Sequence, residues 1–490
     1  MTEAPNIVPA LPEIFIASVG MALLMLGVFQ KVSDNAQEVR TSRLISRLGI
    51  MTLVLSMILV AAVAGGTMVT FSGMFVSDPF AVFFKVLILI ASTLTLVISQ
   101  DYMENQGIPR FEYVILIIFA TLGMMLMVSA NNLLSLYLGL EMQSLSLYVI
   151  ASFNRDDERS TEAGLKYFVL GAVASGMLLY GISLVYGFSG STDFKTLGTL
   201  FSAGQGPHAS IGLIIGIVFI ISGLSFKVSA VPFHMWTPDV YEGAPTPVTA
   251  FFSVGPKIAA IALLTRVMIG PFGDLVQHWQ QIIIFISIAS MLVGAFGAIA
   301  QTNIKRMMAY SSIGHVGYAL IGLVVANESG IRSIMIYMAI YLFMNIGTFA
   351  CILTMRRGDR MVEKISDLAG LSTSHPVLAG ALTIFMFSMA GIPPLAGFFS
   401  KLYIFLSAIE SNFYGLAVIA VLSSVVSAFY YLRIIKVIYF DDQEDPIDKP
   451  INSVLGSVIA GSAIIIILFF AFTSFIIDSS SYAAFSFLEK

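Results

Sequence analysis

Apolar stretches of membrane length recur along almost the whole chain, and this pattern constrains the fold more than any other feature of the sequence. A transmembrane helix needs about 20 mostly apolar residues, within a range of about 17–25. By this rule the sequence predicts about fourteen spans, at 12–29, 45–64, 79–99, 112–130, 132–153, 162–188, 211–241, 246–270, 278–300, 307–326, 331–354, 377–409, 414–440 and 454–477. We therefore expect an all-α polytopic membrane protein, with residues 1–490 forming a single integral membrane domain in contact with the lipid bilayer.

The composition supports this class and excludes several others. Hydrophobic residues make up 57% of the chain and charged residues 11%, whereas a soluble domain carries roughly 25% charged residues. The small net charge of −4 gives no indication of nucleic-acid binding. The longest polar connections, 189–209 and 355–376, are too short for a soluble domain.

Motifs that hold redox cofactors or nucleotides are missing from the sequence. Its single cysteine, Cys351, lies in an apolar run, while an iron–sulfur cluster needs about four cysteine or histidine ligands. Neither a G-x-G-x-x-G motif nor a P-loop occurs. We expect neither a cofactor nor a metal in this chain.

The loops predict an orientation. Basic residues gather on one set of predicted loops, among them Arg40, Arg43, Arg47, Arg155, Arg159, Lys305 and Arg306. The opposite loops hold few, including Lys195, Arg266 and Arg332. Because cytoplasmic loops carry the excess of Lys and Arg, both termini are expected outside, in the periplasm of a bacterial cell. The acidic start, MTEAPNIVPALPE, lacks the basic region of a signal peptide, so we expect the first helix to be retained.

Four charged residues near the middle of predicted spans are the most informative functional signal. Lys227 and Lys401 lie beside proline breaks in the two over-long spans, 211–241 and 377–409, and Lys257 lies inside 246–270. Charges at this depth are rare and commonly mark ion paths. We therefore favour a functional role for these lysines over the alternative, in which a lysine near a helix end extends its ammonium group to the membrane surface. Glu141, in 132–153, is the one acid expected deep in a helix. An ion pair with Lys227 would balance both buried charges.

For other polar residues, a functional and a structural role are more evenly balanced. Lys166 is either a pathway residue or a surface-reaching lysine, and Lys85 is expected to be the latter, since it lies close to the end of its helix. His234 and His315 suit proton relay at neutral pH, but hydrogen-bonded structural histidines fit equally well. Asp239 and Glu242 are not among the candidate pathway residues. They most simply cap a loop at the membrane surface.

Four motifs carry a resemblance to a known family. They are VPFHMWTPDVYEGAPTPV between Lys227 and Lys257, AGIPPLAGFFSKLYIF around Lys401, NIKRMMAYSSIGHVGY around His315, and LYLGLEMQSLSLY around Glu141. Together they resemble the antiporter-like membrane subunits of respiratory complex I, the proton-translocating NADH–quinone oxidoreductase. The VYEGAPTPV ending and Lys401, where subunit M typically has a glutamate, favour the subunit N branch.

The resemblance implies fourteen transmembrane helices with two inverted five-helix repeats, 112–270 and 278–440, and two discontinuous helices. It implies proton translocation through Glu141, Lys227, Lys257 and Lys401, with Lys166, His234 and His315 as lesser candidates, in a bacterial inner membrane. NADH, FMN, iron–sulfur clusters and quinone would be bound by partner subunits. Expected neighbours are subunit M, the small membrane subunits and the lateral helix of subunit L. The alternatives are a subunit of a cation/proton antiporter and a purely structural subunit.

Overall fold

The computed structural model describes residues 5–30, 34–202, 210–358, 360–442, 447–448 and 452–489. Residues 1–4 of the acidic N-terminus and residues 203–209 of the predicted 189–209 connection lie outside this description. The helices are α1 (Leu11–Phe29), α2 (Asn35–Val63), α3 (Pro79–Asn105), α4 (Glu112–Val128), α5 (Leu133–Ala151), α6 (Glu158–Ser189), α7 (Phe194–Ser202), α8 (Ile211–Val228), α9 (Thr237–Gly243), α10 (Thr246–Ile269), α11 (Val276–Ile299), α12 (Ile304–Val325), α13 (Glu328–Thr354), α14 (Leu371–Ser374), α15 (Pro376–Ala390), α16 (Ala396–Glu410), α17 (Tyr414–Phe440) and α18 (Ser453–Leu488).

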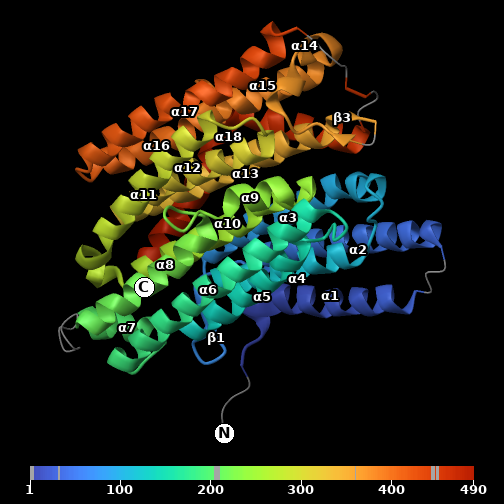
Figure 1. Cartoon of the computed structure of the whole chain (residues 1–490). Coiled ribbons are helices and arrows are strands. Elements are labelled where there is room, and N and C mark those ends of the chain that lie inside the picture. Colours follow the sequence, from blue (N-terminus) through green and yellow to red (C-terminus); the bar gives the residue numbers. More distant parts are fainter. Residues whose placement is uncertain are drawn as a thin grey trace.

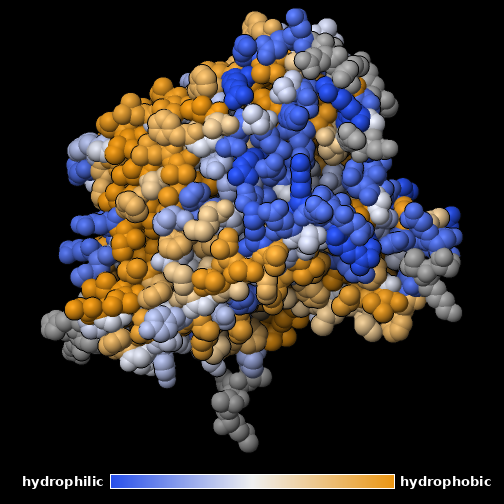
Figure 2. Space-filling model, in the orientation of Figure 1, coloured by the Kyte–Doolittle hydropathy of each residue, from blue (hydrophilic) through white to orange (hydrophobic). Residues whose placement is uncertain are grey.

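The long helices run side by side in one bundle (Figure 1). Within the described residues, 12 helices are long and apolar enough to cross a membrane, and α4 and α15 are shorter apolar helices. This is the expected all-helical membrane class. Helices suit such an environment because every backbone hydrogen bond is made within the segment. Figure 2 shows apolar side chains over the left and lower parts of the visible face, with a broad hydrophilic patch from the centre to the upper right, around α9 and β3.

Many helices begin at an Asp, Asn or Ser whose side chain accepts a hydrogen bond from a backbone N–H of the first turn. Asp78 caps α3, Asn132 caps α5 and Asn303 caps α12. Such caps satisfy N–H groups that have no partner within the helix. Most predicted spans agree with the structure to within a few residues, whereas α2 begins at Asn35, ten residues before the predicted start at 45.

Both over-long spans are interrupted at the predicted prolines. Helix α8 ends at Val228 and α9 begins at Thr237, and Ser229 between them adopts a left-handed conformation with φ 65°. Helix α15 ends at Ala390 and α16 begins at Ala396, with Gly391 at φ 87°. Proline has no N–H to continue the helical pattern, and glycine tolerates a positive φ that other residues rarely adopt.

The connections contain short elements that the sequence analysis did not anticipate. Strands β1 (Met68–Thr70) and β2 (Phe75–Ser77) form an antiparallel hairpin before α3, with Met68 opposite Ser77. Strands β3 (Arg356–Arg357) and β4 (Arg360–Met361) form a second one. Short 3-10 turns occur at Val8–Ala10, Gly273–Leu275 and Ile365–Leu368. Helix α18 runs to Leu488, well beyond the predicted end of its span at 477.

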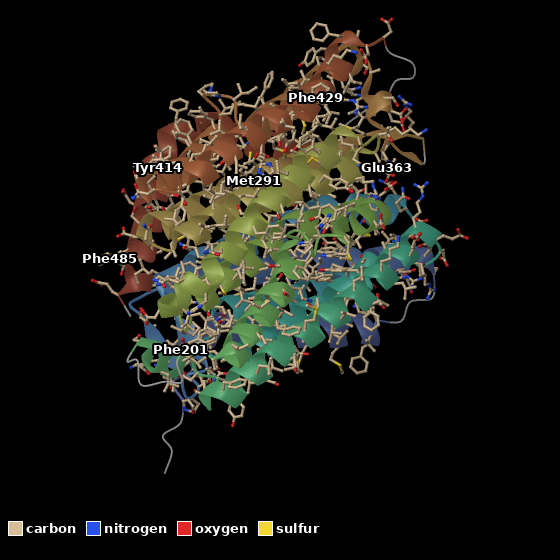
Figure 3. All side chains as sticks on the ribbon, turned by 60° about the vertical axis from the view of Figure 1, so that its left-hand side comes forward. Phe201, Met291, Glu363, Tyr414, Phe429 and Phe485 are labelled. Carbon is tan, nitrogen blue, oxygen red and sulfur yellow. The ribbon has the colours of Figure 1, made fainter. Side chains whose placement is uncertain are left out.

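The core of the bundle is formed by α10, α12 and α13. The apolar part of α10 is completely buried, and those of α12 and α13 nearly so. Figure 3 shows which residues lie at the two ends of the bundle. Glu363 lies at one end, and Phe201, Tyr414 and Phe485 lie at the opposite end. Helix α10 carries Lys257, so the most buried helix also carries one of the candidate charges.

Candidate functional site

Lys227 lies in the last turn of α8, directly before the first break. Its side chain is 6% exposed, and its Nζ donates hydrogen bonds to Ser144 Oγ at 2.7 Å and Tyr148 OH at 3.2 Å. Both acceptors belong to α5. A cation at this position is favoured by the helix dipole, whose negative end is at the C-terminus. The break therefore places the ammonium group between the end of one helix and the hydroxyls of another.

Glu141 lies on the same helix as those hydroxyls but does not contact Lys227 directly. In the described part of the chain, no ion pair joins the two residues, so the expected direct pair is not formed in this structure. One carboxylate oxygen, Glu141 Oε1, is buried without a hydrogen-bond partner. The side chain as a whole is half-buried. That oxygen therefore relies on no direct hydrogen bond from the described residues.

Lys257 is the most isolated of the lysines. It is 1% exposed, and among the described residues its Nζ has no hydrogen-bond partner. The ammonium group lies 5.4 Å from the ring centre of Tyr241 on α9, and a cation in this range is attracted by the aromatic ring. The preceding residue is Pro256, inside α10. Because proline has no N–H, the helix lacks one backbone hydrogen bond one turn before the lysine.

Lys401 lies in α16, just after the second break, whereas Lys227 lies just before the first. Its Nζ donates to the carbonyl oxygen of Ala390 at 3.0 Å, at the end of α15, and to Ser424 Oγ at 2.8 Å on α17. The lysine stem fills the space beside Gly391, where an added Cβ would lie 3.0 Å from Lys401 Cδ. The chain also needs Gly397 here, because a Cβ there would lie 1.8 Å from the Ser388 carbonyl oxygen.

His315 joins a buried cluster of hydroxyl groups near Lys401. Its Nδ1 lies 2.6 Å from Tyr337 OH and its Nε2 lies 3.1 Å from Tyr431 OH. The Tyr431 hydroxyl also contacts Ser311 Oγ. The ring of Tyr318 stands 6.2 Å from the His315 ring, and Lys401 Nζ lies 5.2 Å from the centre of the same tyrosine ring. The structure therefore brings His315 and Lys401 together around Tyr318.

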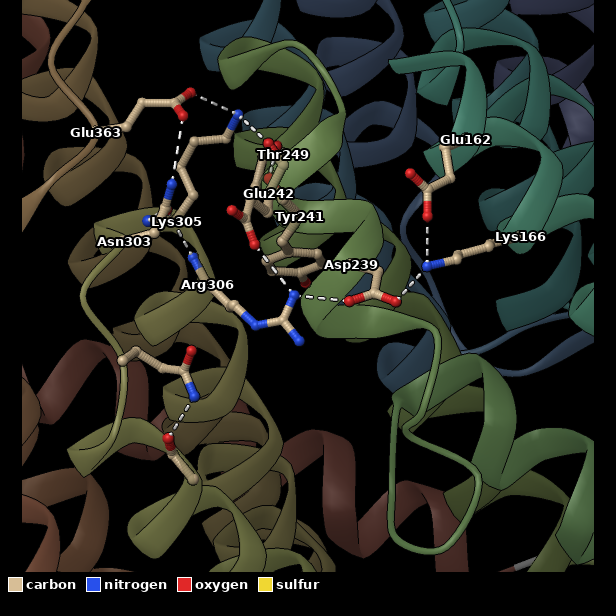
Figure 4. A network of polar contacts seen from close by, with 12 residues as sticks. Glu162, Lys166, Asp239, Tyr241, Glu242, Thr249, Asn303, Lys305, Arg306 and Glu363 are labelled. Atoms are coloured by element: carbon tan, nitrogen blue, oxygen red, sulfur yellow. Dashed lines mark hydrogen bonds and ion pairs between the residues drawn. The ribbon is translucent and has the colours of Figure 1, made fainter. Parts of the chain in front are cut away.

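Lys166 belongs to a different, more exposed set of charges. It binds Glu162 and Asp239, both at 2.7 Å. On the other side of Asp239, Arg306 binds that carboxylate at 2.6 Å and Glu242 at 3.0 Å (Figure 4). These residues line a pocket of about 240 Å³ that opens beside α9. Asp239 and Glu242 thus join α6 to α12 through α9, instead of only capping a loop.

Next to this cluster, Lys305 is buried and holds the end of α9. Its Nζ donates to the carbonyl oxygens of Glu242 and Ala244, both at 2.8 Å, and lies 3.2 Å from Glu363 Oε1. His234 lies half-buried in the first break, and its Nδ1 is buried without a hydrogen-bond partner among the described residues. His234 takes no part in the hydrogen bonds that join His315 to Tyr337 and Tyr431.

Two buried ion pairs were missed by the sequence analysis. Lys85, expected near the surface, is 1% exposed and binds Glu13 at 2.7 Å. Glu13, in the first turn of α1, is itself 3% exposed. Arg266, expected in a loop, is buried at the end of α10 against Asp78. Residues on separate helices pair here, and no spacing within one helix reveals them.

Within the described residues, no group of three or more His, Cys, Asp or Glu side chains is arranged to hold a metal ion. The chemistry that the arrangement offers is that of separated ammonium, carboxylate, imidazole and hydroxyl groups inside a membrane bundle. Such groups exchange and transfer protons when they are hydrogen-bonded in series.

Comparisons with known proteins agree with this arrangement. The domain family NADH:quinone oxidoreductase/Mrp antiporter, TM, matches residues 130–427. The chain is 56% identical over 486 residues to the NADH-quinone oxidoreductase subunit N of Paramagnetospirillum magneticum, covering 99% of this chain and 98% of the relative. It is 56% identical over 478 residues to the protein of the same name from Rhodospirillum rubrum, covering 97% and 96%. A chain of respiratory complex I from Thermus thermophilus with bound aureothin superposes with a TM-score of 0.81 at 29% identity, covering 96% of this chain and 100% of that one.

Fold and buried charges together define an antiporter-like integral membrane protein. Within that class, the chain belongs to the family of NADH-quinone oxidoreductase subunit N.

Proposed function

We propose that the chain is a proton-translocating membrane subunit of NADH–quinone oxidoreductase, which couples quinone reduction in partner subunits to proton movement. The observation that carries this proposal is the state of Lys227, Lys257 and Lys401. All three are buried in the bundle, and their described contacts are hydroxyls, a backbone carbonyl and aromatic rings instead of carboxylates. A lysine stabilised only in this way gains or loses its proton far more readily than one locked in an ion pair.

The proposed mechanism is electrostatic. A change of charge caused by quinone reduction in a partner reaches Glu141, and the interaction of Glu141 with Lys227 strengthens or weakens. A charge on Lys227 then disfavours the protonated form of Lys257, since like charges repel. The proton leaves through Lys401. His315 and its hydroxyl neighbours relay it from Lys257 to Lys401. Moving one charge across the membrane costs about 2.3 kcal/mol per 100 mV, so the redox reaction in the partners supplies the energy.

The finer organisation is part of the same proposal. Adding α4 and the α15–α16 pair to the 12 long apolar helices gives fourteen spans, of which 112–270 and 278–440 form two inverted repeats. Both termini then lie on the periplasmic side of a bacterial inner membrane. Subunit M, the small membrane subunits and the lateral helix of subunit L are the proposed neighbours, and NADH, FMN, iron–sulfur clusters and quinone bind to partner subunits.

The test is Lys227→Ala in inverted membrane vesicles, with NADH-driven quinone reduction and acidification measured together. Assembly of the complex is checked on a native gel. Lys195→Ala is the matched control, because Lys195 is an exposed lysine on α7. We expect both activities to fall in assembled Lys227→Ala complex and to persist in the control.

Two other results would contradict the proposal. If assembled Lys227→Ala complex works normally, the buried lysine is structural. If the variant fails to assemble, the less disruptive Lys227→Met decides, because it keeps the volume of the stem while removing the charge. Normal pumping by that variant would equally reject the relay.

A further inference from the structure

The buried pair of Asp78 and Arg266 lies outside the proposed relay and has a different chemistry. Arg266 Nη1 and Nη2 donate to the two oxygens of Asp78, at 3.0 and 2.8 Å. The arginine is 2% exposed and the aspartate 1% exposed. This two-bond geometry fixes both the distance and the orientation of the partners. Asp78 also caps α3 by accepting from the N–H of Ala81, so the pair ties the end of α10 to the beginning of α3.

Two phenylalanines close the pair off. The Arg266 guanidinium carbon lies 5.0 Å from the ring centre of Phe80 and 5.4 Å from that of Phe487. The two rings also contact each other, with centres 4.6 Å apart. Phe487 belongs to the last turns of α18, which extend beyond the predicted span, and Ala483 and Ala484 in the same turns are buried. The end of α18 therefore covers the ion pair.

An arginine in such a pair cannot serve as a proton carrier. Its guanidinium group keeps its proton at any pH that proteins tolerate. The pair consequently differs from the three lysines of the relay, and its contribution is a fixed geometry.

What the pair fixes is the half of α10 that carries Lys257. Arg266 lies nine positions after Lys257, a rise of about 13.5 Å along the helix. Pro256 removes the backbone bond that would join this half to the turn containing Phe252. Lys257 Nζ has no hydrogen-bond partner among the described residues and contacts the face of Tyr241, so the position of the ammonium group depends strongly on the helix backbone.

We propose that the Asp78–Arg266 pair, covered by Phe487, is a positioning element that holds Lys257 at its depth and orientation in the membrane. This inference rests on the proposed function, in which Lys257 carries a proton. Asp78, Arg266 and Phe487 act through Lys257 and do not themselves transfer protons.

The test compares assembled complexes that differ only at this pair. In Asp78→Asn/Arg266→Gln, the charges are removed together, so no unpaired charge is left buried. Phe487→Ala removes the cover and leaves the pair intact, and Phe487→Tyr restores a ring. Protons pumped per NADH oxidised and the pH profile of quinone reduction are measured in inverted vesicles.

The matched control is Glu13→Gln/Lys85→Met, which removes another buried pair and changes no residue of α10. We expect pumping per assembled complex to fall by roughly tenfold to a hundredfold in the Asp78/Arg266 variant, because a misplacement of about 1 Å costs up to about a hundredfold, and we expect a shifted pH profile. Phe487→Ala should show a smaller loss that Phe487→Tyr reverses. The control should keep the wild-type pumping ratio and pH profile.

Normal pumping and an unchanged pH profile in assembled Asp78/Arg266 variant would overturn the inference. If that variant does not assemble, Phe487→Ala decides in the same way. Lys257→Met separates this inference from the function on which it rests. Intact pumping in Lys257→Met rejects the proposed function, whereas lost pumping there together with normal pumping in the Asp78/Arg266 variant rejects only the positioning role.

Discussion

The three lysines of the relay differ in how the protein holds the ammonium group, and this difference predicts opposite effects on stability. Lys401 donates to a carbonyl and a hydroxyl, whereas Lys257 contacts the face of Tyr241. Lys401→Met removes the donor to the Ala390 carbonyl and to the Ser424 hydroxyl, and a buried acceptor left without a partner costs about 1–3 kcal/mol. Lys257→Met removes a charge that is costly to bury and leaves no acceptor unpaired.

We therefore expect Lys257→Met to keep or raise the melting temperature of the purified complex and Lys401→Met to lower it. Both variants should lose proton pumping, measured in inverted vesicles. A larger loss of melting temperature in Lys257→Met than in Lys401→Met would contradict this account of the two sites.

At the scale of elements, the short helix α9 is held between α6 and α12 by charges at the first break. Arg306 binds both Asp239 and Glu242 (Figure 4). Because these groups are about one-third exposed, each pair contributes only about 0.2–1 kcal/mol. Arg306→Ala should therefore leave the global fold intact and loosen α9 locally.

Hydrogen exchange of the backbone amides measures this loosening. We expect faster exchange in α9 of Arg306→Ala, by a factor of roughly five to ten for about 1–1.4 kcal/mol. Arg43→Ala, which breaks an exposed pair with Glu104 on α2 and α3, is the control and should leave α9 unchanged. Equal exchange of α9 in wild type and Arg306→Ala would show that the network does not hold this element.

The elements themselves were largely predictable from the sequence, because apolar length and proline position are local properties. The breaks after Lys227 and before Lys401 follow from Pro232 and Pro393 in over-long apolar stretches. The pairs Glu13–Lys85 and Asp78–Arg266 were not predictable, since each joins helices far apart in the chain. Lys85 lies near a helix end, but its own side chain is buried there against Glu13 of α1.

At the scale of the whole molecule, one exposed face of α5 is apolar and yet carries the carboxylate Glu141. The exposed fractions of Leu134, Leu138, Leu145 and Val149 are 45, 68, 56 and 53%, and their spacing places them on one side of the helix. Glu141 lies between Leu138 and Leu145 on this side and is half-buried. A carboxylate beside lipid is costly, so we expect a partner subunit to cover this face.

Replacing Leu138 by the photo-crosslinking amino acid p-benzoylphenylalanine tests this expectation. In membranes that contain the assembled complex, ultraviolet light should join the chain to a neighbouring protein subunit, detected as a heavier band on a denaturing gel. The same variant expressed without its partners is the control and should give no such band, because lipid then covers the position. If the assembled complex also gives none, α5 faces lipid, and Glu141 must be stabilised within this chain instead of by a neighbour.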